Sequence, residues 1–238
     1  MYKQKRFNMV QDIDKNIFKK LIKKDNPIIF DVGAFDGNDS IEFLNIFNNA
    51  NVYAFEIDDR SLELFKQYVN NSSVQLFETA LSNIDGEISF YKSDSDTRKH
   101  KRHDNEKTWS ASSSIKKPDN HLNIFQDISF DQVVKVKSTK LDTWISDKDI
   151  KLIDIMWVDV NGGEEEFLNG AINTINNKVN YLYIEFNAVD NEKGQTSLYE
   201  NCITKNDICK KLNQFEEIGV YNFMGNFGNV LLKNKNIS

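Results

Sequence analysis

The sequence is poor in the residues that crosslink small secreted domains or bind metals. It has only two cysteines and three histidines in 238 residues. Cys202 and Cys209 fall in what we expect to be one helix, on the same face but too far apart for a disulfide. No histidine lies near them in the sequence to complete a set of metal ligands. We therefore expect packing or surface thiols, and no metal site, at these two positions.

An excess of positive charge and a long apolar run are also missing. The formal net charge is −6, the pI is about 5.2, and the basic residues are dispersed among acidic ones. This distribution argues against a surface for nucleic acid. The basic start, residues 1–6, is not followed by an apolar run long enough for a signal peptide or a membrane span. We expect a cytoplasmic protein with no nucleic acid and no membrane as partner.

The apolar content suits a large α/β core. Hydrophobic residues make up 39% of the chain, and they include 17 Phe and 8 Tyr, enough to cover both faces of a central sheet. No internal repeat and no linker divides the chain. We expect one domain over residues 1–238. Residues 1–26 form an N-terminal helical extension, whose helix covers 11–24 and ends before Pro27.

Strands and helices are expected to alternate along most of the chain. The predicted strands are 28–30, 52–56, 74–80, 87–91, 133–137, 153–160, 181–186, 215–221 and 227–233. Further predicted helices are 38–47, 61–69, 141–145, 164–175 and 206–212. Because the link 83–86 is too short for a parallel crossover, 74–80 and 87–91 are expected to form an antiparallel pair. The last two strands are expected to form a closing hairpin on a doubly wound α/β sheet.

Residues 92–118 form a long polar stretch within this pattern. A loop of this length is either a functional lid or mobile. His100, His103 and Asp104 have the chemistry of metal ligands, but the basic residues among them favour a solvated segment. Trp109 and the serines that follow it suit a sugar-binding lid, because tryptophan stacks on sugar faces and hydroxyls bond sugar oxygens. An ordinary serine-rich loop is an equal alternative.

The end of the first predicted strand carries a glycine turn, with the sequence DVGAFDG. In open α/β sheets, ligands bind beyond the carboxyl ends of the strands. Glycines let the backbone turn there and approach a ligand closely. The cofactor-binding candidates in this turn are Asp31, Gly33, Ala34, Asp36 and Gly37. We expect Asp31 to anchor an ammonium group of the ligand, directly or through water.

Two further strand ends complete a predicted nucleoside site. Glu56 ends the second strand and is followed by Ile57, and a carboxylate in that place accepts hydrogen bonds from both hydroxyls of a ribose. Ala80 and Leu81, at the third strand end, are expected to lie beside the adenine and offer backbone N–H groups. The alternative is that the glycines only shape a turn and that Glu56 is solvated.

The glycine turn fits S-adenosylmethionine better than a dinucleotide. A dehydrogenase seats a pyrophosphate on a G-x-G-x-x-G turn, whereas this turn has Gly33 and Gly37 with the carboxylate of Asp36 beside them. Negative charge there opposes a diphosphate. S-adenosylmethionine has an ammonium, a sulfonium and a ribose but no phosphate. The sequence therefore predicts S-adenosylmethionine as the cofactor, and an NAD-linked oxidoreductase stays as the weaker alternative.

Five segments in order resemble the FkbM-type methyltransferases. They are 30–37, 53–56, 80–83 with Gly86, 141–143, and 157–164 continuing through 168–171. The resemblance covers about residues 27–233. It implies a class I methyltransferase fold, with a mostly parallel seven-stranded sheet and an antiparallel C-terminal hairpin. It also implies methyl transfer from S-adenosylmethionine to a hydroxyl of a sugar, a glycan or a secondary metabolite. The sequence departs from the family at Asn161, where Glu is usual, and at Gly163, where Ala is usual.

The later strand ends supply candidates for catalysis. In the fold that the resemblance implies, Asp159 ends the strand that points at the sulfonium, and we expect it to contact the cofactor and to act as the base or to orient the acceptor. Glu164 follows at a helix start, where helix capping is an equal interpretation. Glu185 with Asn187 is expected to bind acceptor hydroxyls or to complete an oxygen-rich metal site with Asp159, unless it is simply solvated. A divalent metal is compatible with these residues but is not predicted.

Asn161 also motivates a second hypothesis. Because it replaces a carboxylate, the alternative hypothesis is a catalytically idle domain that binds S-adenosylmethionine without turnover. For the active enzyme, the expected partner is a small-molecule or glycan acceptor. Acceptor pockets in this fold are built from variable loops, so the sequence leaves the acceptor and the oligomeric state open.

Overall fold

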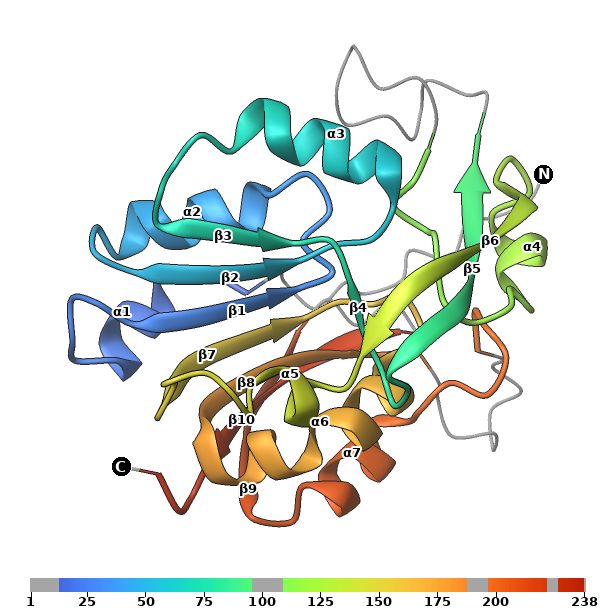
Figure 1. The fold of residues 1–238 in the computed structure, drawn as a ribbon. Coiled ribbons are helices and arrows are strands. Elements are labelled where there is room, and N and C mark those ends of the chain that lie inside the picture. Colours follow the sequence, from blue (N-terminus) through green and yellow to red (C-terminus); the bar gives the residue numbers. More distant parts are fainter. Residues whose placement is uncertain (1–12, 96–108, 188–196, 222–226, 238) are drawn as a thin grey trace, which may run out of the picture.

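The computed structural model describes residues 13–95, 109–187, 197–221 and 227–237 (Figure 1). The helices are α1 (Ile17–Leu21), α2 (Asn38–Ile46), α3 (Asp59–Tyr68), α4 (His121–Ile124), α5 (Leu141–Trp144), α6 (Glu164–Lys178) and α7 (Lys205–Lys211). The strands are β1 (Ile28–Val32), β2 (Asn51–Phe55), β3 (Val74–Phe77), β4 (Ala80–Leu81), β5 (Gly86–Asp94), β6 (Ser129–Thr139), β7 (Ile153–Val158), β8 (Val179–Phe186), β9 (Phe215–Tyr221) and β10 (Gly228–Asn234).

The main sheet has seven strands in the order β3-β2-β1-β7-β8-β10-β9. The first five run parallel, and β1 pairs with both β2 and β7, so that Asp31 lies opposite Ala54 and Trp157. The strand order reverses between β1 and β7, which makes their carboxyl ends the switch point where ligands bind in such sheets. The predicted mostly parallel seven-stranded sheet is confirmed.

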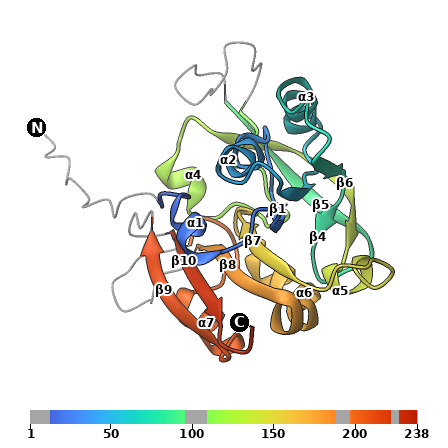
Figure 2. The same ribbon diagram turned by 90° about the vertical axis from the view of Figure 1, so that its left-hand side faces the viewer.

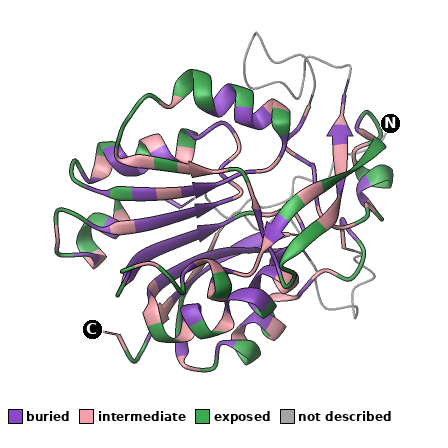
Figure 3. Cartoon of the chain, viewed as in Figure 1, coloured by how far each residue is buried: buried purple, intermediate pink, exposed green. Residues whose placement is uncertain are grey.

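Helices cover both faces of this sheet (Figures 1 and 2). On one face, α1 and α2 bring Phe18 and Phe43 into a cluster with Ile155, and α3 lies beside them. On the other face, α5, α6 and α7 pack, and Phe167 of α6 joins a cluster with Met156. Neighbouring residues of β7 thus enter opposite clusters, as the period-two alternation of a strand requires. Figure 3 shows the central strands β1, β7 and β8 buried along most of their length, and the doubly wound architecture is confirmed.

The expected pairing of residues 74–80 with 87–91 is wrong. β3 ends at Phe77, and β5 pairs antiparallel with β6, from Gly86 opposite Ser138 to Asp94 opposite Ser129. The short β4 joins the other edge of β6, which makes a separate sheet in the order β4-β6-β5. The short link between 74–80 and 87–91 excluded a parallel crossover, but it did not require the two segments to pair. The long β6 satisfies more backbone groups of β5 than the four-residue β3 would.

The C-terminal strands form the predicted hairpin. β9 and β10 are antiparallel, and β10 also pairs antiparallel with β8, which places it inside the sheet. Helix α7 starts after Thr204, whose side chain accepts a hydrogen bond from the backbone N–H of Asp207. Cys202 therefore precedes the helix that contains Cys209, and the expectation that one helix holds both is wrong. Both cysteines are free thiols.

The N-terminal helix is shorter than its sequence pattern. Within the described part of residues 11–24, α1 covers only Ile17–Leu21, while Ile13 and Ile22 are also buried. No helix of the described segments combines the length and the apolar character that a membrane span needs. The apolar positions near α1 instead pack against the sheet face that α2 also covers.

Candidate functional site

A cavity that is partly open to solvent lies at the carboxyl ends of the parallel strands. Its walls come from the ends of β1, β2 and β7, from the chain between β3 and β4, and from the segment that follows residue 108. The residues whose atoms line this cavity include Gly33, Asp39, Glu56, Ile57, Asp58, Ser61, Thr79, Ala80, Leu81, Ser110, Ala111, Ser113, Ser114, Ile115, Asp159 and Asn161. A concave site at the switch point of an α/β sheet is where small ligands and cofactors usually bind.

The glycine turn after β1 is shaped by the end of β7. Gly33 has φ +83°, and a Cβ at this position would lie 1.7 Å from the carbonyl oxygen of Asp159. The N–H groups of Gly33 and Ala34 both donate to the carbonyl of Phe55, at 3.0 Å each. Any side chain larger than hydrogen at position 33 would therefore separate the ends of β1 and β7, which together form this part of the cavity.

Asp36 and Gly37 start α2. Gly37 precedes the helix with φ +82°, and Asp36 accepts a hydrogen bond of 3.0 Å from the N–H of Asn38. Asp36 is buried and, like Ala34 and Gly37, does not line the cavity. These three residues therefore help to form the turn but do not face the cavity.

Asp31 is buried away from the cavity, although the sequence suggested it as an anchor for an ammonium. Its side chain is 1% exposed and accepts a hydrogen bond from the hydroxyl of Ser40. Burial raises the pKa of Asp31 to about 8, and the nearby charge of Asp39 adds to the shift. Asp39, in the first turn of α2, does line the cavity. Asp39 was not predicted as a site residue, because its local sequence signal is no more than a carboxylate at a helix start.

Asp39 is held by two residues from outside α2. Lys15 forms an ion pair with it, and the indole N–H of Trp157 donates to its Oδ2 at 3.2 Å. The ammonium of Lys15 also lies 4.6 Å from the centre of the Trp157 ring. These contacts fix the carboxylate at the mouth of the glycine turn.

Glu56 occupies the second wall of the cavity with Ile57. Its Oε2 accepts a hydrogen bond of 2.8 Å from the N–H of Phe35, and its Oε1 accepts from Ile57 and Asp58 at 2.6 and 2.7 Å. Burial raises the pKa of Glu56 to about 7, against the lowering effect of these three donors. The carboxylate is thus oriented by the glycine turn and the start of α3. A carboxylate has about four acceptor positions, two on each oxygen, so Oε2 keeps one that can accept from a ligand.

The third wall brings the other predicted nucleoside contacts to the same cavity. Thr79, Ala80 and Leu81 line it where the chain passes from β3 into β4. Ala80 and Leu81 are held there because they pair with Ser138 and Thr139 of β6. The pairing of β4 with β6 in the second sheet therefore positions this wall of the cavity.

Asp159 and Asn161 form the wall at the end of β7. Asp159 is exposed and lines the cavity, and its N–H donates to the carbonyl of Val32 at 3.0 Å. Asn161 has φ +51°, a left-handed conformation that asparagine adopts more readily than other residues with a Cβ. This backbone geometry gives a physical reason for an asparagine at a position where the family usually has Glu.

Glu164 and Glu185 lie behind this wall and do not line the cavity. Glu164 is the first residue of α6 and is fully buried, and its Oε1 accepts from the N–H of Gly162 at 3.1 Å. Burial raises the pKa of Glu164 to about 8, and Asp159 adds to the shift. Burial, then Asp159 and Glu164, also raise the pKa of Glu185 well above its ordinary value. The three carboxyl groups thus gather as predicted, but only Asp159 reaches the cavity.

These carboxyl groups do not form a metal centre in the described structure. No group of three His, Cys, Asp or Glu side chains among the described residues has an arrangement that could hold a metal ion. Asn187 donates to Glu185 at 2.6 Å instead. His100, His103 and Asp104 lie outside the described residues.

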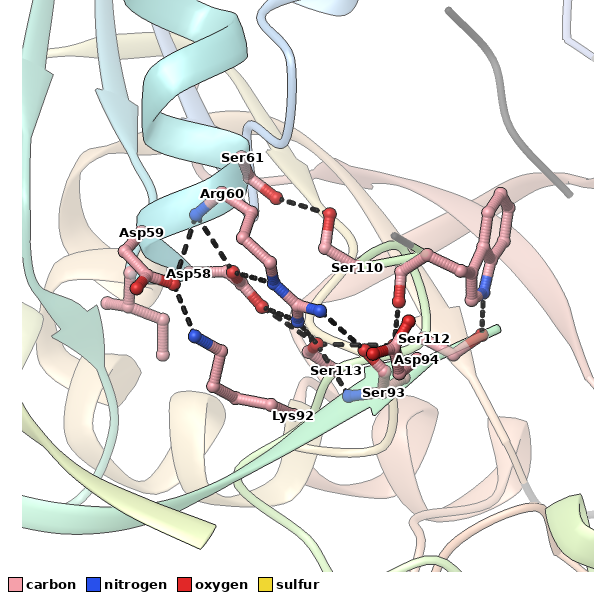
Figure 4. A network of polar contacts seen from close by, with 12 residues as sticks. Asp58, Asp59, Arg60, Ser61, Lys92, Ser93, Asp94, Ser110, Ser112 and Ser113 are labelled. Carbon is pink, nitrogen blue, oxygen red and sulfur yellow. Dashed lines mark hydrogen bonds and ion pairs between the residues drawn. The ribbon is translucent and has the colours of Figure 1, made fainter. Parts of the chain in front are cut away.

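The serine-rich part of residues 92–118 lines the cavity on its remaining side. Ser110, Ala111, Ser113, Ser114 and Ile115 all contribute. Trp109 does not line the cavity, and its indole N–H donates to the hydroxyl of Ser112 at 2.9 Å. Residues 96–108 of the predicted lid lie outside the described structure. The sequence pointed to this segment, but not to the partners that hold it (Figure 4).

The comparisons with known proteins agree with this geometry. Residues 31–224 match the family described as the methyltransferase FkbM domain. The 2-O-methyltransferase NoeI of Sinorhizobium fredii is 33% identical over 215 residues, which are 90% of this chain and 82% of NoeI. The crystal structure of methyltransferase FkbM from Methylobacillus flagellatus KT superposes with a TM-score of 0.50 at 14% identity.

That superposition covers 90% of this chain and 45% of the Methylobacillus chain, so this chain spans less than half of that protein, and at this identity the likeness supports the fold alone. The family match and the relative at 33% identity show the family as well as the fold. The matched region contains the glycine turn, Glu56 and Asp159. The chain therefore belongs to the FkbM methyltransferase family, whose methyl donor is S-adenosylmethionine.

Proposed function

We propose that this protein transfers the methyl group of S-adenosylmethionine to a hydroxyl oxygen of a sugar, a glycan or a related small metabolite. The observation that carries the proposal is that Glu56 and Asp159 line the same cavity. One is a buried carboxylate oriented by three backbone N–H groups, and the other is exposed at the end of β7. The relative NoeI is a 2-O-methyltransferase, which supports oxygen as the methylated atom.

The cofactor site has a polarity that suits S-adenosylmethionine. We assign the ribose hydroxyls to Glu56 and the adenine to the wall formed by Thr79, Ala80 and Leu81. Asp39, rather than the buried Asp31, is the carboxylate placed to attract the positively charged methionyl end. Gly33 lets this end approach the backbone closely. A dinucleotide fits poorly, because Asp39 lines the cavity beside the glycine turn and would place negative charge near the diphosphate.

The chemistry requires little beyond positioning and one base. S-adenosylmethionine supplies an electrophilic methyl group on a sulfonium. The hydroxyl oxygen of the acceptor forms the new bond to the methyl carbon as the carbon–sulfur bond breaks, and the proton of the hydroxyl passes to the carboxylate of Asp159. Alignment of the acceptor contributes much of the rate, and a positioned base contributes typically 10²–10⁴-fold. Because Asp159 is present on the cavity wall, the loss of a carboxylate at Asn161 does not remove this base.

Two variants separate binding from chemistry. Glu56→Ala should weaken binding of S-adenosylmethionine by about 1.5–3 kcal/mol, measured by calorimetry, because a buried charge-assisted contact to the ribose is lost. Asp159→Asn should bind the cofactor about as tightly as the wild type. With a panel of sugar and metabolite acceptors, its rate of methyl transfer, measured as S-adenosylhomocysteine formed, should be at least about 10²-fold lower. Glu78→Ala, which removes a surface carboxylate that pairs with Lys66, is the matched control.

The outcomes are distinct. A wild-type protein that binds neither S-adenosylmethionine nor S-adenosylhomocysteine contradicts the proposed site. Binding by the wild type without turnover on any acceptor supports the catalytically idle alternative. Turnover that survives in Asp159→Asn would mean that another group takes the proton.

A further inference from the structure

The segment Trp109–Ile115, here called the serine wall, lines one side of the cavity without regular structure of its own. Five of its seven residues line the cavity. Among the described residues, its backbone pairs with the backbone of a strand through the bridge between Ser114 and Tyr91, with N–O distances of 2.7 and 3.0 Å. Ordering a residue costs roughly 1–2 kcal/mol of backbone entropy. Side-chain contacts must therefore hold the serine wall in place.

Arg60 makes the central contacts of this kind (Figure 4). It lies in the first turn of α3, directly after the cavity residues Glu56 to Asp58. Its Nε and Nη2 donate to the two carboxylate oxygens of Asp58, at 2.8 and 2.6 Å. Its Nη1 donates to the carbonyl of Ser93 in β5 at 2.8 Å, and its Nη2 also donates to the hydroxyl of Ser113 at 3.2 Å.

Ser113 is the serine-wall residue that this network holds. Its hydroxyl donates to Asp58 at 2.9 Å and accepts from the N–H of Ser93 at 3.0 Å. Asp58, Ser93 and Ser113 are all buried. A second link lies close by, where the hydroxyls of Ser61 and Ser110 are 3.0 Å apart. The start of α3, strand β5 and the serine wall therefore share one buried polar network.

We propose that Arg60 is a positioning residue for cofactor binding, which holds the serine wall against the cavity by joining Asp58 to Ser93 and Ser113. The proposal rests on the proposed function, because it takes the cavity as the site of S-adenosylmethionine. Arg60 itself does not line the cavity. Its guanidinium neutralises the buried Asp58, whose carboxylate then accepts from the serine wall. A wall held in advance spares the ligand the cost of ordering it.

The same helix and strand offer a matched control. Lys92 of β5 pairs with Asp59 of α3 at 2.5 Å, next to the Arg60 network, and its ammonium takes no part in the hydrogen bonds described for Ser113. A variant at Lys92 removes one cationic link between α3 and β5. It leaves the network around Ser113 intact.

The test uses Arg60→Ala, Arg60→Lys, Ser113→Ala and Lys92→Ala, with S-adenosylhomocysteine as the probe in calorimetry. We expect the Kd to rise by about tenfold in Arg60→Ala and by a smaller factor in Ser113→Ala, which keeps the ion pair. The Kd of Arg60→Lys should lie between those of Arg60→Ala and the wild type, because lysine keeps the charge but not the planar guanidinium with its several donors. Lys92→Ala should bind as the wild type does.

Hydrogen exchange separates positioning from general destabilisation. In the free protein, Arg60→Ala and Ser113→Ala should accelerate exchange in peptides covering 109–115 while strands β1 and β7 stay as protected as in the wild type. Saturating S-adenosylhomocysteine should restore protection of 109–115 in part. The inference would be overturned by wild-type affinity in both Arg60→Ala and Ser113→Ala, or by a loss of affinity in these two variants no larger than that in Lys92→Ala. Either outcome would leave the proposed function standing. A wild-type protein that does not bind the probe would overturn both.

Discussion

The hydroxyl of Ser114 donates a hydrogen bond of 2.6 Å to the backbone carbonyl of Asn161. This bond joins the serine wall to the turn after β7, where Asn161 has its left-handed backbone and Asp159 faces the cavity. The same hydroxyl accepts from the N–H of Lys116 at 2.9 Å, and Ser114 is 1% exposed. One buried side chain thus connects the predicted lid with the predicted catalytic turn.

Ser114→Ala should lower the free energy of unfolding by about 1–3 kcal/mol, because it removes two hydrogen bonds to part-buried backbone groups, each contributing about 0.5–1.5 kcal/mol. Urea denaturation measures this loss. Ser146→Ala is the control, since the Ser146 hydroxyl also donates to a backbone carbonyl, that of Thr143 at 2.7 Å, but on an exposed residue. A loss in Ser114→Ala no larger than in Ser146→Ala would mean that the link contributes little.

Gly170→Ala should destabilise the protein although alanine is the better helix former. Gly170 lies within α6, where replacing glycine by alanine usually gains about 1 kcal/mol. Here a Cβ would lie 1.8 Å from the carbonyl oxygen of Ser82, in the chain just after β4. We expect a net loss of at least about 2 kcal/mol in the free energy of unfolding, measured by urea denaturation.

An exposed position of the same helix is the control for this substitution. Asn177→Ala lies on the exposed face of α6, and we expect its effect to stay within about 0.5 kcal/mol. If Gly170→Ala raises stability, then the chain at Ser82 can move away from α6 at little cost.

Glu164→Gln should change the dependence of stability on pH. Burial raises the pKa of Glu164 from 4.5 to about 8, with Asp159 adding to the shift. Between these values the folded state holds a proton that the unfolded state has released. The free energy of unfolding should therefore fall as the pH rises from about 4.5 to 8, by at most about 1.4 kcal/mol per pH unit for this group.

Glutamine cannot titrate, so the variant should lose less stability than the wild type between pH 5 and pH 8.5. Its side-chain oxygen can still accept from the N–H of Gly162, as Oε1 of Glu164 does. Urea denaturation at several pH values measures the two slopes. Glu165→Gln, at a surface carboxylate that pairs with Lys211 at 3.4 Å, is the control. Equal slopes in Glu164→Gln and the wild type would show that Glu164 is ionised in the folded protein.

Several parts of the cavity could be predicted from local sequence. Glycines directly after a strand, an acidic residue at the next strand end and Asp159 at a later one all belong to parallel strands. The carboxyl ends of such strands meet at one edge of the sheet. The structure brings Gly33, Glu56 and Asp159 to one cavity for this reason. Their exact roles stay predictions until the variants are measured.

Other features were beyond local patterns. Local spacing did not show that β5 would pair with β6 and not with the third strand. Nor did it show that Asp39, and not Asp31, would line the cavity. It also did not show that Glu164 and Glu185 would be buried behind Asp159. Each of these depends on which distant segments compete for the same backbone groups or the same volume.

The sequence by itself determined the alternation of most strands and helices and the residues near the ends of β1, β2 and β7, because side-chain period and turn chemistry act over a few neighbouring residues. Only the tertiary structure decided which of those residues face the cavity and what holds its last wall. Asp58 and Ser113, which meet at 2.9 Å, are 55 positions apart. Contacts at that separation form only when the packed sheet and its helices bring both segments to one place, since loop closure and burial, not local propensity, set their free energy.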